Sequence, residues 1–452
     1  MKNLFKILTA FTFLITFNSC ADYVDGLDKS PNSPTDVPLS LLVPSAGLST
    51  VSTYTGQLAR MASIFTQQSK GRQFQYELLE IYDFNENDVD NDWNQIYNRG
   101  LINSQLIIDK AGSSNPHSRG IGRVLKALNL GIATDYWGDI PNKEALKGLI
   151  GESAFNPAFD SQESVIQDIQ SLLDGAIADF GLAAGPEDGA AIESDLINKS
   201  VTEWITAAYI LKARYANRLS KKDPIASADL ALTNVNAALT AGGQGTYAKF
   251  GSNANEFNQW YAFNQERALY MTMGTKLMGL LNSSGDPRTS FYAEKSNGQY
   301  SDSSIIGSLY GSANSPLPLV TLVEAKFIQA EALLRKGNRV QAIDAYNEAV
   351  SMSVLKVTGA EIADPFKTAV LLDKTTGDLT LEQLMTQKYI AMFTQPEVWA
   401  DYRRTTYPTL SPNAGAVVNG IPQRLPTAQS ERLYNTKAVV VSDLLAKVWW
   451  AQ

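Results

Sequence analysis

Cysteine and histidine are nearly absent from this sequence, which holds one of each in 452 residues. A single histidine, His117, excludes a multi-histidine metal site and argues against a serine or cysteine nucleophile activated by histidine. The common glycine-rich phosphate loops, GxGxxG and GxxxxGK followed by serine or threonine, are also absent. A chain of this length buries roughly three quarters of its unfolded surface and needs no disulfide. We therefore expect neither a metal nor a cofactor.

Positive charge is also in the minority. The chain has 38 lysines and arginines against 46 aspartates and glutamates, a formal net charge of -8 and a sequence pI near 5.0. No basic run is present, and phosphate contacts need clustered lysine and arginine, so we expect no nucleic-acid partner. The acidic residues do not exclude a glycoside hydrolase, because such an enzyme needs only two carboxylates and their separation in space cannot be read from sequence.

Alternating acids at residues 88–92 resemble the start of a calcium-binding EF-hand loop. Such a loop needs glycine at its sixth position and glutamate at its twelfth, and here those positions are Trp93 and Arg99. We reject the EF-hand. We expect Asp90 and Asp92 to favour the N-terminus of the helix that contains Trp93, as caps and as partners of the helix dipole.

The N-terminus has the layout of a bacterial signal peptide. Lys2 and Lys6 precede an apolar run over residues 7–17, which is too short to span a bilayer. The run ends at Ser19-Cys20, which resembles a lipoprotein box in which Cys20 becomes the lipidated first residue; the alternative is an ordinary signal with a coincidental cysteine. We expect a signal peptide at residues 1–19, a lipid-anchored tether rich in Ser, Pro and Asn at 20–40, and a single domain at 41–452.

The body of the chain reads as mainly helical, with the clearest unit at residues 321–352. Small and apolar residues at helical spacing fill its first half, Gly337-Asn338 ends that helix, and the second half carries another apolar face. Small residues at Ala330 and Ala342, with Tyr346 and Ala349 following, match the tetratricopeptide pattern of about 34 residues. They allow two helices to cross closely.

Similar pairs occur earlier in the chain. We expect one between residues 93–110 and 119–135, and another helix at 164–180, so the whole predicts a helical-repeat scaffold with long irregular insertions, above all at residues 241–320. A degenerate copy of the tetratricopeptide unit is carried by Trp204, Ala208 and Leu211 in its first helix and by Ala231, Val235 and Ala238 in its second.

Four blocks of sequence occur in a characteristic order along the chain. They are Pro31-Asn32-Ser33-Pro34-Thr35 before Leu41-Leu42-Val43-Pro44; the run from Ile121 that includes Trp137-Gly138-Asp139-Ile140-Pro141; Glu324-Ala325-Lys326-Phe327 with Ala330-Glu331-Ala332; and residues 387–408 with 421–426. Together these blocks resemble the SusD/RagB family of nutrient-binding outer-membrane lipoproteins, in its shorter SusD-like branch. Gln395-Pro396 departs from the pattern, because the family usually has glycine there.

The resemblance implies a mostly helical fold of about four tetratricopeptide-like pairs, anchored through Cys20 at the outer membrane and facing the exterior. It implies a SusC-like TonB-dependent transporter as partner, with this chain as a lid that delivers an oligomeric nutrient, usually an oligosaccharide and sometimes a peptide. We expect Trp399, Arg403 and Arg404, which lie in the fourth block, to fix helix ends and not to touch ligand. No binding residue is carried over from the family.

Two stretches offer the mixture that a sugar site needs, aromatic platforms beside polar side chains. The alternative for any single ring is a place in the core. A peptide-binding lid is the second functional hypothesis and a surface glycoside hydrolase the third, although the sequence favours a binding protein over an enzyme. The predicted ligand-binding residues are Phe74 and Tyr76 in the first stretch and Asn258, Trp260, Tyr261 and Phe263 in the second.

Overall fold

The computed structural model describes residues 37–452. The predicted signal peptide, Cys20 and most of the predicted tether lie outside this part of the chain. The first described helix, α3 (Leu39–Thr55), begins within the last two residues of the predicted tether. Residues 39–452 form one compact unit. None of the helices within residues 37–452 combines the length and apolar character that crossing a bilayer would require.

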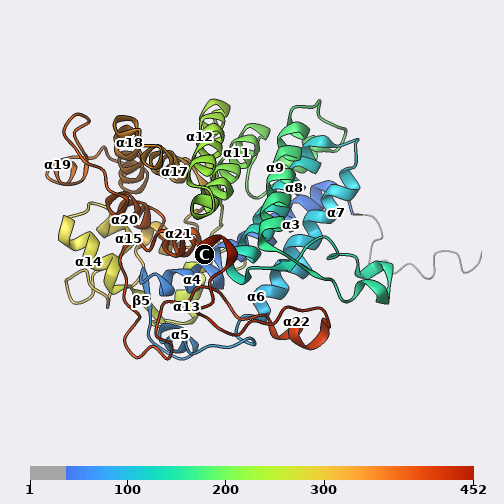
Figure 1. Cartoon of the computed structure of the whole chain (residues 1–452), viewed down its shortest axis with the longest axis horizontal. Coiled ribbons are helices and arrows are strands. Elements are labelled where there is room, and N and C mark those ends of the chain that lie inside the picture. Colours follow the sequence, from blue (N-terminus) through green and yellow to red (C-terminus); the bar gives the residue numbers. More distant parts are fainter. Residues whose placement is uncertain (1–36) are drawn as a thin grey trace, which may run out of the picture. The chain divides into compact units, whose positions relative to one another are not determined.

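The structure is mainly helical, and its long helices pack in series (Figure 1). Each contacts the next: α7 packs on α8, α8 on α9, α9 on α11, α11 on α12, α12 on α17 and α17 on α18, while α20 also contacts α17. The predicted helical-repeat scaffold is therefore confirmed. The bounds of these helices are α7 Ile102–Ala111, α8 Pro116–Trp137, α9 Gln162–Phe180, α11 Val201–Arg218, α12 Pro224–Ala241, α17 Leu322–Arg335, α18 Arg339–Thr358 and α20 Leu381–Ala391.

The predicted unit at residues 321–352 is the pair α17–α18. The Thr321 hydroxyl accepts from the Glu324 amide and caps α17, which satisfies one of the free N–H groups of the first turn. The turn to α18 passes through Gly337, whose φ of +74° suits glycine. Ala330 and Ala342 are fully buried, so the small residues do lie where the two helices cross.

The degenerate copy is the pair α11–α12, and all six residues that predicted it are buried. Residues 93–110 do not form one helix: α6 (Asp90–Gln95) runs into a π-helical turn (Ile96–Leu101) before α7. The acids at the start of α6 are not side-chain caps, because its first turn has no such hydrogen bond. Asp90 instead accepts from the Ser430 amide at 2.7 Å, and so ties α6 to a distant segment.

Shorter elements surround the long helices, and the predicted irregular segment 241–320 contains several of them. Three antiparallel two-stranded sheets join distant parts of the chain: β1 (Ser69–Gly71) with β5 (Met271–Met273), β2 (Ile140–Pro141) with β3 (Phe159–Asp160), and β4 (Gly245–Ala248) with β6 (Leu317–Thr321). The remaining helices of four or more residues are α4 Gln57–Phe65, α5 Gln75–Glu80, α10 Asp188–Ser194, α13 Gln259–Glu266, α14 Thr275–Ser284, α15 Thr289–Tyr292, α16 Ser308–Gly311, α19 Phe366–Val370, α21 Glu397–Thr405 and α22 Gln429–Tyr434.

A buried charge network joins α8, α11, α17, α20 and α21. Arg214 donates to both oxygens of Glu324 at 2.7 Å, and Arg404 donates to both oxygens of Glu331. Lys388 and Asp401 form a further pair at 2.7 Å. Each carboxylate in the network has a cationic partner, which is what allows these charges to stay buried. The network consists of Asp135, Arg214, Arg218, Glu324, Glu331, Arg335, Lys388, Glu397, Asp401 and Arg404.

Ionisation within the network follows the number of arginine partners. Burial opposes the charge on Glu331, but Arg404 and Arg335 outweigh it and lower its pKa to about 2. For Asp135 burial prevails over the attraction of Arg218 and raises the pKa to about 6. Because the network draws its members from α8, α11, α17, α20 and α21, its ion pairs fix how these helices lie against one another.

Side chains of the fourth block make contacts that hold the fold together. Trp399 donates through Nε1 to the Pro422 carbonyl at 2.8 Å, and the Arg403 guanidinium lies 3.9 Å from the centre of the Trp399 ring. Arg403 also donates to the carbonyl of Asp135, in the last turn of α8. These contacts bind the segment 421–426 to the helices.

Candidate functional site

The predicted residues on α13 are mostly buried. Asn258 caps the helix: its Oδ1 accepts from the amides of Trp260 at 2.8 Å and Tyr261 at 3.1 Å, and its Nδ2 donates to the Ser315 carbonyl at 2.7 Å. The Trp260 side chain is 3% exposed and packs edge-on against Phe393. Tyr261 is half-buried. Asn258 and Trp260 therefore hold α13 in place in this structure.

The two predicted stretches meet in space, although they are far apart in sequence. The ring of Tyr76 lies 4.7 Å from that of Phe263, and both are buried. Arg60 lies 4.6 Å from the centre of the Phe263 ring and donates to the Tyr76 hydroxyl at 2.8 Å. Phe74 is 65% exposed and stacks on Tyr270 at 4.9 Å. We call the pair Phe74 and Tyr270 the aromatic platform.

A concave site with aromatic walls lies elsewhere, between α6, the π-helical turn, the segment after β2 and α22. This pocket has a volume of about 600 Å³. Sequence reasoning did not single it out. We call it the aromatic pocket; its main side chains are Trp93, Asn94, Tyr97, Asn98, Phe155, Glu431, Tyr434 and Asn435.

The inner wall of the aromatic pocket is held by hydrogen bonds. Trp93 is nearly fully buried and donates through Nε1 to Glu431 at 3.2 Å. The other carboxylate oxygen of Glu431 accepts from Asn435 at 2.9 Å. Tyr97 lies on the π-helical turn, 4.5 Å from Trp93 between ring centres, and its hydroxyl donates to the Pro141 carbonyl at 2.7 Å. Short π-helical turns are frequent at functional sites.

The outer wall consists of two exposed rings and amides. Tyr434 is 78% exposed and Phe155 is 57% exposed. Asn98 is also exposed; its side-chain amide donates to Asn94, and within residues 37–452 no hydrogen bond engages its side-chain carbonyl oxygen. Exposed rings beside amide and carboxylate groups can contact the apolar face of a ligand while its polar edge is hydrogen-bonded.

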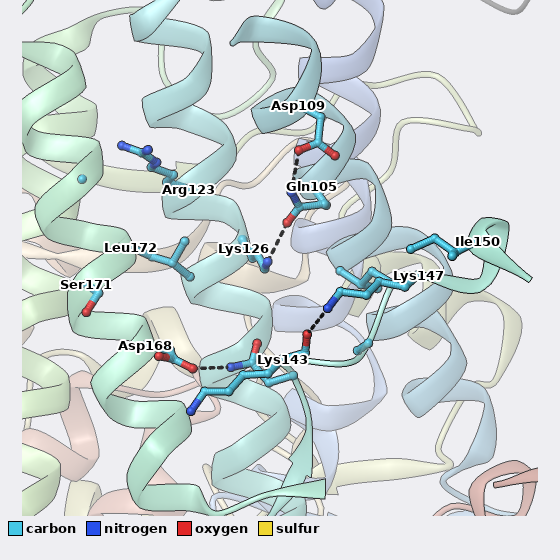
Figure 2. Close-up of a pocket in the computed structure, with 14 residues that line it drawn as sticks. Gln105, Asp109, Arg123, Lys126, Lys143, Lys147, Ile150, Asp168, Ser171 and Leu172 are labelled. Carbon is cyan, nitrogen blue, oxygen red and sulfur yellow. Dashed lines mark hydrogen bonds between the residues drawn. The ribbon is translucent and has the colours of Figure 1, made fainter. Parts of the chain in front are cut away.

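A second pocket, of about 680 Å³, lies on the other side of the segment after β2 (Figure 2). Ala145 and Leu146 line both pockets, so the two are neighbours. Leu146 has a φ of +64°, a conformation that a leucine rarely adopts. We call this second site the cationic pocket; its charged side chains are Arg123, Lys126, Lys143 and Lys147 with Asp109 and Asp168.

No signal in the sequence marked either pocket, because each brings together residues from several segments that are far apart in the chain. The aromatic residues that line the aromatic pocket are not clustered more closely along the sequence than those of the two predicted stretches. Within residues 37–452, no group of three or more histidine, cysteine or acidic side chains is placed to hold a metal ion. What the two pockets offer is binding surface: rings and amides in one, ammonium groups in the other.

Comparisons with known proteins agree with this fold. Residues 31–426 match a family model described as starch-binding and associating with the outer membrane. A SusD/RagB family protein from Bacteroides thetaiotaomicron is 23% identical with a TM-score of 0.74, covering 92% of this chain and 99% of its own. A chitin-binding SusD homologue from Flavobacterium johnsoniae is 20% identical with a TM-score of 0.70, covering 92% and 96%. No curated protein matches the chain.

Proposed function

Because this chain belongs to the SusD-like family, whose members are described as starch-binding and associating with the outer membrane, we propose that it binds an oligosaccharide in the aromatic pocket. The observation that carries the proposal is the pairing of the exposed rings of Tyr434 and Phe155 with the polar groups of Asn98 and Glu431. Sugars present apolar C–H faces with hydroxyl rims, and such a wall matches both.

The predicted site remains part of the proposal as a second sugar-contacting surface. Phe74 is its exposed ring and stacks on half-buried Tyr270. Phe263 contacts both Tyr270 and Tyr76, and Asn258, Trp260 and half-buried Tyr261 cap or lie on α13, the helix that carries Phe263. A flat exposed stack suits the face of a single sugar, whereas the aromatic pocket encloses more of a ligand. We therefore expect the pocket to contribute more to affinity than the platform does.

The test is a titration of purified protein with starch- and chitin-derived oligosaccharides and with peptides. Tyr434→Ala should weaken binding of the oligosaccharide by about tenfold to a hundredfold, the usual cost of removing an anchoring aromatic ring. Leu433→Ala is the matched control, since Leu433 is exposed beside Tyr434 but does not line the pocket.

Equal affinities of wild type and Tyr434→Ala for a proven ligand would reject the aromatic pocket. Binding of peptides but not of any oligosaccharide would instead support a peptide-binding lid. Appearance of shortened oligosaccharides during long incubation would point to a glycoside hydrolase.

We further propose that the chain is anchored in the outer membrane through lipidated Cys20 and faces the exterior. Cys20→Ser should release it into the soluble fraction, because the acyl chains supply the attachment. A Cys20→Ser variant that still sediments with outer membranes after a high-salt wash would show that anchoring does not depend on this residue.

The last part of the proposal is delivery to a SusC-like TonB-dependent transporter, with this chain as its lid. The support is the family membership, together with a helical array that offers a broad surface for a large protein partner. Deletion of the gene should impair growth on limiting oligosaccharide and leave growth on the monosaccharide intact. Normal import of the oligosaccharide at low concentration by the deletion strain would refute the lid role.

A further inference from the structure

The cationic pocket concentrates positive charge in a chain that is acidic overall. It is lined by four cationic side chains and two carboxylates, on α7, α8, α9 and the segment after β2 (Figure 2). Of the four cations, Arg123 is occupied by Asp179, to which it donates at 2.7 Å. The other three are the lysines Lys126, Lys143 and Lys147.

None of these three lysines forms an ion pair within the part of the chain that the structure describes. Lys126 donates to the Gln105 amide oxygen at 2.6 Å, Lys143 to the Ser164 hydroxyl at 2.7 Å and Lys147 to the Lys143 carbonyl at 2.7 Å. Their partners are thus neutral oxygen atoms, so none of the three ammonium groups is in contact with a carboxylate of the described residues.

The two carboxylates of the pocket are already engaged by amides. Asp109 accepts from Gln105 at 2.8 Å, and Asp168 accepts from Asn142 at 2.7 Å. Burial lowers the pKa of Lys126, while Asp109 and Asp168 act in the opposite direction. An anion that enters the pocket would strengthen the charged form of Lys126 and could accept a charge-assisted hydrogen bond from it.

The position of the pocket relates it to the proposed sugar site. Both pockets share Ala145 and Leu146, and α7 contributes Ile102 to one and Gln105 to the other. These two α7 residues are three apart, or about 5 Å along the helix axis. A ligand chain lying across Leu146 would therefore enter both pockets at once.

We propose that the cationic pocket binds an anionic substituent, a carboxylate or a sulfate ester, on the same oligosaccharide whose neighbouring sugar occupies the aromatic pocket. This inference rests on the proposed function and narrows it to acidic glycans. The lysines supply the attraction, and the rings of the aromatic pocket supply contact with the sugar face.

The experiment compares acidic oligosaccharides with neutral counterparts of the same length. The probes are an oligogalacturonide and its carboxyl-reduced form, and a sulfated galactan oligosaccharide that contains no uronic acid and its desulfated form, each titrated calorimetrically at low and at high salt. We expect an acidic probe to bind at least about tenfold more tightly than its neutral counterpart at low salt, since hydrogen bonds to charged groups are the stronger ones. High salt should reduce the difference.

The variants Lys126→Met and Lys147→Met should each remove most of this preference and leave affinity for the neutral probe unchanged. Lys367→Met is the matched control, because Lys367 is an exposed lysine on α19, which lies far from α7–α9 in Figure 1. Lys147 is exposed, so its replacement should not affect folding, and thermal melts verify this for every variant.

The outcomes separate the two proposals. Equal affinity for acidic and neutral probes overturns the anion site and leaves oligosaccharide binding intact. Binding of acidic probes that depends on the lysines but not on Tyr434 supports the anion site and rejects the aromatic pocket. Failure of every oligosaccharide to bind rejects both. The carboxylate and sulfate probes show which anion is preferred.

Discussion

The buried charge network and the cationic pocket both gather positive side chains, but they differ in what faces them. In the network, guanidinium groups meet carboxylates: Arg404 and Arg335 share Glu331, and Arg214 and Arg218 share Glu397. In the cationic pocket, the lysines meet an amide, a hydroxyl and a carbonyl. In the network, the positive groups are therefore paired with carboxylates of the chain itself. In the cationic pocket, we propose that the anion comes from a ligand.

The choice of cation follows the same division. Arginine presents a planar fork that matches a carboxylate with two hydrogen bonds, which suits permanent pairs in a core. Lysine is a mobile point charge on a flexible stem, which suits reversible contact with a ligand. Paired charge in this protein therefore marks structure, and unpaired charge in a concavity marks a candidate for binding.

The largest expected effect is on the network. Glu331→Ala leaves Arg404 and Arg335 without their shared carboxylate in the protein interior, and breaking such a buried pair costs about 3–5 kcal/mol of unfolding free energy. Urea denaturation measures it. Exposed Glu382 on α20 provides the control, since Glu382→Ala should change the free energy by less than about 0.5 kcal/mol. Similar losses for both variants would mean that the network is dispensable.

The next effect concerns the predicted site. Trp260→Ala should lower the free energy of unfolding by about 3 kcal/mol, near the lower end for a buried aromatic, because the indole N–H of Trp260 has no hydrogen-bond partner to lose. Affinity for the oligosaccharide should change little. A large loss of affinity without a change in melting temperature would transfer the binding role from the aromatic pocket to α13.

Stability should also depend on pH through Glu331. Its pKa in the folded chain is about 2, below the ordinary value of 4.5, so its ionised form stabilises the fold above pH 4.5 and this contribution is lost as the pH falls toward 2. Asp135, with a pKa raised to about 6, acts in the opposite direction and offsets part of the loss. In denaturation experiments, the free energy of unfolding of Glu331→Gln should fall less steeply with decreasing pH than that of the wild type. An unchanged slope would show that other carboxylates dominate the acid dependence of stability.

The smallest effect is expected at the aromatic platform. Phe74→Ala removes an exposed ring, so stability should change by less than about 0.5 kcal/mol. Affinity for the oligosaccharide should fall less than it does in Tyr434→Ala. If Phe74→Ala weakens binding more than Tyr434→Ala does, the platform is the main sugar site and the aromatic pocket is secondary.

The fold could be predicted from the sequence because the patterns that indicate it are local. Ala330 and Ala342 recur at the spacing that lets α17 and α18 cross, and Trp204 and Ala231 repeat the arrangement in α11 and α12. Helical periodicity can be recognised in a single sequence, because the spacing of apolar residues along one helix shows which of its faces is buried.

The aromatic pocket could not be predicted in the same way, because it depends on contacts between segments that are distant in the sequence. Asn435 and Pro157 meet at the aromatic pocket although they are 278 positions apart. Aromatic density also fails to separate a platform from a core: Trp260 is buried while Tyr434, with few aromatic neighbours in sequence, is exposed. The resemblance to a family supplied the function class, but its third and fourth blocks supply most of the carboxylates of the buried charge network and do not line the aromatic pocket.

The left-handed backbone of Leu146 has a consequence for how this protein can change over evolution. Leu146 lies in the connection between β2 and β3, residues 142–158, which forms a wall of both pockets, while the helices behind it are fixed by their own packing. An insertion, deletion or substitution in this connection would alter the width of one pocket and the charge of the other in a single step. Ligand preference can thus diversify in one loop while the scaffold stays under a separate selection for stability.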